Sequence, residues 1–116
     1  MDKDGARWTG VDLDGTLALA GEGWPEPDEI GEPIEGMMEW VKRAMSNGNN
    51  IKIFTARAGW EESLPHVKAW LKKHGLGNLE ITNVKDMYCD RILDDKAIQV
   101  LRNSGLVIGI HPAGVL

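Results

Sequence analysis

The sequence predicts an α/β protein with a three-layer, doubly wound, Rossmann-like parallel sheet of about five strands. Short apolar runs rich in β-branched residues alternate along the chain with amphipathic stretches. This alternation is typical of parallel strands that are buried on both faces and joined by helices. The length of 116 residues suits one compact domain, and no repeat or linker divides the chain. We therefore expect residues 1–116 to form a single core domain.

The first three elements are predicted from apolar spacing and from the positions of Gly and Pro. An apolar strand is expected over residues 7–13. Gly and Pro concentrate in the next segment, which predicts a loop or short hairpin, here called the flap, at about residues 16–32. A helix should begin near Pro33, because proline suits a first helical turn and apolar residues follow at spacings of three and four. Asn47-Gly48 should end that helix.

The rest of the chain continues the alternation of strand and helix. In chain order we expect a strand at 50–55, a helix at 60–74, strands at 79–82 and 91–93, a helix at 97–103 and a strand at 106–110. Within the second helix, Ser63 is a candidate cap and Pro65 fits the first turn.

Charge and composition exclude several classes of protein. The formal net charge is −5, but residues 1–39 carry eleven acids and two bases, a net −9, whereas residues 40–116 carry seven acids and eleven bases, a net +4. Five Trp and regular apolar runs argue against disorder. No apolar run approaches the roughly 18 residues that a membrane span needs, and residues 1–10 are too polar for a signal peptide. With one cysteine, no internal disulfide can form, so we expect a cytoplasmic protein without a membrane partner.

Polar side chains gather where the predicted strands end. In an open parallel sheet, the ligand crevice lies outside the carboxyl ends of the strands. The residues predicted to meet there are Asp12 and Asp14 after the first strand, Thr55 after the second, Lys85 before the fourth, and Asp94 and Asp95 after it. Four acids at one rim would repel one another unless a cation intervened. A hard divalent ion with oxygen ligands, Mg²⁺, is the simplest explanation.

The spacing of the first two acids suggests a division of labour. Asp12 fits a carboxylate nucleophile, and Asp14, two residues later, can protonate a leaving oxygen and then help a water attack the acyl phosphate. Thr55 and nearby backbone N–H groups would hold phosphoryl oxygens. Lys85 would neutralise charge on the nucleophile and on the transferred group.

These motifs resemble those of the haloacid dehalogenase (HAD) superfamily. Four appear in the family's order: VDLDGTL at 11–17, IFTAR at 53–57, Lys85, and ILDD at 92–95. The resemblance spans about residues 8–100. It implies that Asp12 is the nucleophile and a metal ligand, and that Asp14 is the acid/base and gives the metal its backbone carbonyl.

The same resemblance implies the remaining site residues. Thr55 is similar to the family's phosphate binder, with Ala56 and Arg57 beside it, and Lys85 to its stabilising lysine. Asp94 is similar to the direct metal ligand and Asp95 to the acid that holds a metal-bound water. Family members with an acid at the position of Asp14 are phosphatases, because an alkoxide leaving group needs a proton. The resemblance thus implies phosphate monoester hydrolysis.

The short gaps between the motifs imply a minimal family member without a cap domain. Such an open site either accepts a bulky phosphorylated substrate or is covered by a neighbouring subunit, as in a homo-oligomer. The flap and the residues just beyond it are acidic, with Glu22, Glu26, Asp28, Glu29, Glu32 and Glu35. These acids should repel nucleic acid, so a small or medium phosphate ester is favoured over a nucleic-acid end, for which a 3'-phosphatase activity is the alternative. Trp24 either acts as a lid or packs against the body.

Several alternatives stay open at this stage. Lys96 competes with Lys85 as the stabilising lysine. Thr55 can be a helix cap, as can Asp94 or Asp95, and Arg57 can contact substrate or pair with an acid. The rival functions are a receiver-like phosphoacceptor domain, whose motif order differs, and a catalytically silent binding domain.

Overall fold

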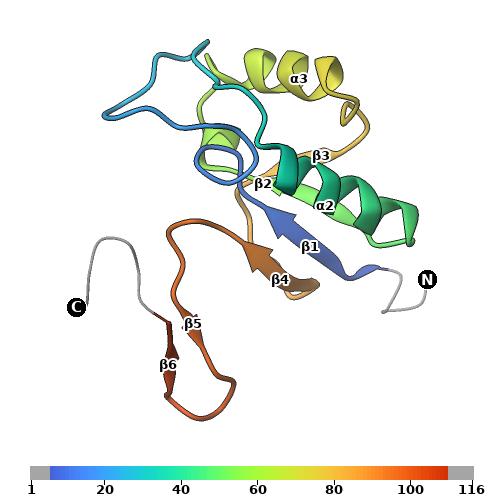
Figure 1. Cartoon of the computed structure of the whole chain (residues 1–116), viewed down its shortest axis with the longest axis vertical. Helices are drawn as coiled ribbons and strands as arrows, with labels where there is room; N and C mark the ends of the chain where they lie inside the picture. The colour runs from blue at the N-terminus through green and yellow to red at the C-terminus, as the bar shows by residue number, and fades with distance from the viewer. Residues whose placement is uncertain (1–5, 110–116) are drawn as a thin grey trace.

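The centre of the structure is a parallel sheet of four strands. The structure, a computed structural model, describes residues 6–109. The strands are β1 (Trp8–Val11), β2 (Ile51–Phe54), β3 (Glu80–Thr82) and β4 (Cys89–Leu93), in the order β3-β2-β1-β4. All three neighbouring pairs are parallel. This order places the ends of β1 and β4 side by side (Figure 1).

Two α-helices and one 3₁₀ helix connect the first three strands. Helix α2 (Glu35–Ser46) joins β1 to β2, and η1 (Ala56–Gly59) and α3 (Leu64–Lys73) join β2 to β3. The predicted stop after α2 is confirmed, since Gly48 has a φ of 84° that glycine adopts without strain.

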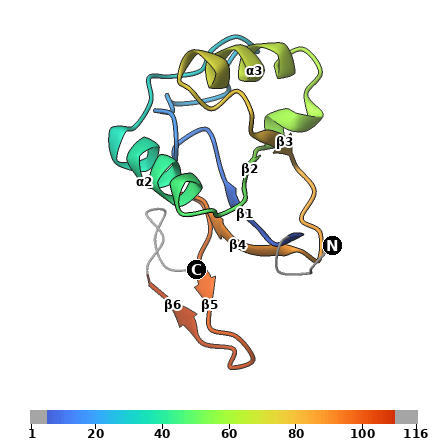
Figure 2. The ribbon, with the colours of Figure 1, turned by 90° about the vertical axis from the view of Figure 1, so that its right-hand side faces the viewer.

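Both α-helices pack on the same face of the sheet. Parallel crossover connections are right-handed, so two successive crossovers that move in one direction across a sheet place their helices on one face. The buried faces of α2 and α3 share one core with alternate residues of the sheet. This core contains Val11, Ile51 and Ile53 from the sheet, Met38, Val41 and Ala44 from α2, and Val67, Trp70 and Leu71 from α3. Figures 1 and 2 show both helices on one side of the molecule.

The opposite face of the sheet has no helix over it in the part of the chain that is described. Its side chains come from the other alternate positions. The Trp8 and Phe54 rings lie 6.1 Å apart between centroids, and the Lys52 ammonium lies 4.8 Å from the centroid of the Trp8 ring. The expected third layer is therefore not formed by residues 6–109.

The expectations for the last two elements were wrong. The segment predicted as a helix at 97–103 contains strand β5 (Gln99–Val100), and the predicted fifth parallel strand is β6 (Val107–Ile108). They pair antiparallel in a separate hairpin that extends away from the helices (Figures 1 and 2). The turn contains Asn103 with φ 60° and Gly105 with φ 71°, and residues that tolerate positive φ favour such turns over a helix.

Other boundaries differ by a few residues. Helix α2 begins at Glu35 instead of Pro33, because Pro33 forms a bridge with Ala18 at the base of the flap. Leu19 N–H donates to Glu32 C=O at 2.8 Å and closes this base. Between these two residues the flap has neither helix nor strand. Residue 110, placed in the fifth strand by the sequence prediction, lies outside the described residues. None of the helices among residues 6–109 is long and apolar enough to cross a membrane.

Candidate metal centre

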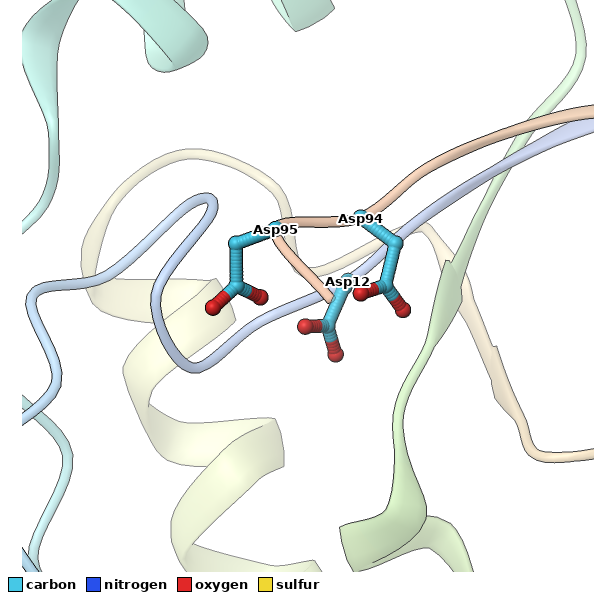
Figure 3. A group of neighbouring side chains, drawn as sticks. All are labelled: Asp12, Asp94 and Asp95. Carbon is cyan, nitrogen blue, oxygen red and sulfur yellow. The ribbon is translucent and has the colours of Figure 1, made fainter. Parts of the chain in front are cut away.

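The adjacent ends of β1 and β4 bring three carboxylates together. Val11 pairs with Leu93 in the sheet, and Asp12 N–H donates to Leu93 C=O at 2.9 Å. One carboxylate oxygen from each of Asp12, Asp94 and Asp95 lies within 4.8 Å of the others. Figure 3 shows the three carboxyl groups pointing to the same side. The structure therefore confirms the prediction that Asp12, Asp94 and Asp95 lie close together.

The cluster strongly disfavours the ionised form of its central member. Burial raises the pKa of Asp12 from 3.8 to about 7, and the charges of Asp94 and Asp95 and a hydrogen bond with Asp95 add to this rise. The Leu13 backbone N–H, which donates to the Asp12 carboxylate, opposes it. A cation held by the three carboxylates would reverse this balance, because it favours the charged form of each ligand. All three donors are oxygen atoms, which suits Mg²⁺ or Ca²⁺.

The turn after Asp12 is shaped to hold Asp95. Gly15 has a φ of 85°, and a Cβ at this position would lie 2.5 Å from Asp95 Oδ2. Thr16 Oγ1 accepts from the Asp95 backbone N–H at 3.0 Å and donates to Asp95 Oδ1 at 3.3 Å. Sequence reasoning gave Thr16 no role, although its place directly after Gly15 in the motif was the available signal.

Asp14 lies outside the carboxylate cluster and is paired with Arg57. Arg57 Nε donates to Asp14 Oδ2 and Nη2 to Oδ1, each at 2.8 Å. The Arg57 side chain is 4% exposed and the Asp14 side chain is 34% exposed, so the guanidinium is buried while the carboxylate keeps access to water. Of the two roles predicted for Arg57, the structure contains the salt bridge. The predicted metal contact of Asp14 involves its backbone carbonyl, a different atom.

Thr55 caps the 3₁₀ helix that follows β2. Its Oγ1 accepts from Arg57 N–H at 3.1 Å, and its own backbone N–H donates to Thr82 C=O. The cap interpretation of Thr55 is thus confirmed, and the residue is 3% exposed. Ala56 is exposed next to it. Phosphate binding by Thr55, Ala56 and Arg57 stays a prediction.

The structure does not bring either candidate lysine into the cluster. Lys85 is exposed in the segment between β3 and β4. Burial raises the pKa of Cys89, and the charge of Lys85 partly offsets this, which puts Lys85 near the start of β4, whereas Asp94 follows its end. The Lys96 side chain is exposed, and its backbone N–H donates to Asp94 Oδ1 at 2.7 Å. Among residues 6–109, neither ammonium group forms an ion pair with an acid of the cluster.

The flap is exposed along most of its length. Its acidic side chains lie in solvent, and Trp24 is 98% exposed. The hypothesis that Trp24 packs against the body is therefore wrong, and the lid role stays a prediction. The Ser63 hydroxyl does not cap α3 but donates to the flap carbonyl of Pro27 at 2.8 Å.

Comparison with protein-family models, with curated proteins and with solved structures finds no match. The motifs of the sequence and the geometry of this site are therefore the features that point to a function.

Proposed function

We propose that the protein is a Mg²⁺-dependent phosphate monoester hydrolase that works through an aspartyl-phosphate intermediate on Asp12. The observation that carries this proposal is the meeting of Asp12, Asp94 and Asp95 at the ends of β1 and β4. With a pKa of about 7, the half-buried Asp12 carboxyl is only partly ionised at neutral pH, and a cation that offsets the repulsion from Asp94 and Asp95 would favour its charged form. The order of the motifs, which resembles that of the HAD superfamily, supports the same assignment.

In the proposed reaction, an oxygen of Asp12 attacks phosphorus and the bond from phosphorus to the ester oxygen breaks. Asp14 gives a proton to the departing alkoxide, so the alcohol leaves neutral. Asp14 then accepts a proton from water as the water oxygen attacks the aspartyl phosphate. This second step breaks the bond from phosphorus to Asp12 and releases inorganic phosphate. A bound Mg²⁺ would supply positive charge to the phosphoryl oxygens.

Thr55 is assigned to a phosphoryl oxygen, and Lys85 or Lys96 to the charge on the nucleophile. Both lysines are exposed. The side chain of Lys96, next to Asp95, would need to turn toward the cluster, whereas Lys85 precedes β4 and would need the segment that carries it to move. The acidic flap favours a small or medium phosphate ester over a polyanion, since like charges repel a nucleic acid.

Hydrolysis of p-nitrophenyl phosphate tests the proposal directly. The wild-type protein should release p-nitrophenol with Mg²⁺ and lose this activity in excess EDTA. Asp12→Asn should lower kcat by at least about a thousandfold, because loss of a nucleophile removes the covalent route. Glu39→Gln, an exposed acid-to-amide change on α2, is the matched control and should leave the rate unchanged.

Equal turnover by Asp12→Asn and the wild type, or activity that survives the chelator, would contradict the proposal. A screen of phosphate release from sugar phosphates, nucleotides and phosphorylated DNA ends then identifies the substrate class. Faster release from DNA 3'-phosphates than from small esters would favour the nucleic-acid alternative.

A further inference from the structure

We propose that Arg57 is a positioning residue that links the flap to Asp14, so that the orientation of this carboxylate depends on where the flap lies. The inference rests on the proposed function for the role of Asp14. The contact that carries it is a buried guanidinium bonded to the carboxylate on one side and to flap carbonyls on the other.

Every N–H of the Arg57 guanidinium has an acceptor. Besides the two bonds to Asp14, Nη2 donates to Glu29 C=O at 2.6 Å. Nη1 donates to Pro27 C=O at 3.2 Å and to Ser63 Oγ at 2.9 Å. A guanidinium has five N–H donors, so these five bonds leave none for a phosphate. This observation favours a positioning role over direct phosphate binding in this arrangement.

Arg57 bonds to two carbonyls in the middle of the flap. Pro27 and Glu29 each give their carbonyl to Arg57, and Ser63, which also accepts from Arg57, donates to Pro27. Nearer the end of the flap, Trp70 Nε1 donates to Gly31 C=O at 2.9 Å and Ile30 packs against the core. Displacing residues 27–29 would therefore take away two acceptors of Arg57 and loosen the guanidinium that fixes Asp14.

The geometry also explains why a lysine cannot do the same task. The planar fork of arginine holds both carboxylate oxygens at once, while an ammonium group acts as a point charge on a flexible stem. A carboxylate held at both oxygens has a defined plane and direction. It must release at least one oxygen before it can carry a proton to a leaving group, and movement of the flap gives a route for that release.

Amide hydrogen exchange of residues 19–32 tests the link without reference to activity. Arg57→Lys and Arg57→Gln should raise exchange at least about tenfold at the Glu29 amide, whose N–H donates to Glu26 C=O at 3.0 Å beside the Arg57 contacts, because exchange follows the free energy of local opening. Asp14→Asn should also raise it, because the carboxylate bonds to Arg57 and not to the flap among the described residues, and the change weakens the partner that orients Arg57. Arg43→Gln, an exposed arginine on α2, is the control. Unchanged flap exchange in both Asp14→Asn and Arg57→Lys overturns the proposal.

Kinetics with two leaving groups test the positioning role. An alkyl phosphate needs a proton on its leaving oxygen, whereas p-nitrophenolate leaves with little help. Arg57→Lys should lower kcat on the alkyl ester by about tenfold to a hundredfold, within the range attributed to general acid catalysis, and should change kcat on p-nitrophenyl phosphate less than about threefold. In an Asp14→Asn background the same change should have almost no further effect on the alkyl ester.

A rise in KM for both esters with kcat preserved would instead assign Arg57 to phosphate binding and overturn the positioning role. If the wild-type protein hydrolyses neither ester, the proposed function fails, and the exchange experiment still decides whether Arg57 links the flap to Asp14.

Discussion

Asp12 is a half-buried acid whose protonation is coupled to folding when no cation is bound. Its pKa rises from 3.8 to about 7, chiefly through burial and then through the charge of Asp94. A raised pKa means that the folded state holds the proton more tightly than the unfolded state. The stability gained from this proton is complete below about pH 4 and is lost as the pH rises through about 7.

Thermal unfolding in EDTA from pH 4 to pH 8 checks this expectation. The Tm of the wild type relative to that of Asp12→Asn should fall as the pH rises, because the amide cannot ionise. At pH 8 the variant should be the more stable protein. A difference in Tm that is independent of pH contradicts the assigned environment of Asp12.

Substitutions at Gly15 and Gly48 distinguish the cost of backbone strain at positive φ from the cost of a steric clash with a neighbouring side chain. Both have positive φ, 85° and 84°, but a Cβ on Gly15 would meet Asp95 whereas a Cβ on Gly48 would meet nothing within 4 Å. Gly48→Ala should therefore cost only the backbone term of about 1–2 kcal/mol. Gly15→Ala should cost more and should also weaken metal binding, since Asp95 must move. Chemical denaturation with a metal titration of each variant measures both effects, and equal metal affinity in the two variants would argue against the assigned position of Asp95.

Among the elements, those whose apolar positions face one shared core were predictable. Helices α2 and α3 and the first strands follow local spacing, and their side chains fill one cluster. The sequence also predicted that Asp12, Asp94 and Asp95 lie close together, because each follows a predicted parallel strand and such strands end at one edge of the sheet. The contact between Asp14 and Arg57 was open at the sequence level, since it depends on how the flap and η1 fold against each other.

The last two elements could not be predicted in the same way. Residues 97–103 contain Ile98 and Val100, whose branched side chains fit a strand better than a helix. The positive φ of Asn103 and Gly105 then turns the chain back, and Leu101 N–H donates to Leu106 C=O at 2.9 Å. The alternation of strand and helix earlier in the chain led us to expect a helix here, but the residues of this turn favour a hairpin.

At the scale of the whole molecule, the acids of residues 1–39 separate into two structural groups. Asp12 belongs to the carboxylate cluster, and Asp14 is neutralised by Arg57. Most of the other early acids lie exposed on the flap and the start of α2. The net −9 of residues 1–39 thus combines one member of a candidate metal site, an acid paired with Arg57 and an exposed acidic surface.

This separation predicts that divalent cations stabilise the folded protein through one specific site. A ligand that binds only the folded state adds about 2.7 kcal/mol at a concentration one hundred times its Kd. Mg²⁺ or Ca²⁺ should therefore raise the Tm at pH 7.5 in a saturable way, and less so at pH 5, because the ligands must be deprotonated. Asp94→Asn should abolish the shift, whereas Glu39→Gln should retain it. NaCl at matched ionic strength is the control, because it measures general screening of the exposed acids. A rise in Tm of equal size in NaCl, or a rise with Mg²⁺ that survives Asp94→Asn, would assign the effect to the acidic surface and not to the cluster at the ends of β1 and β4.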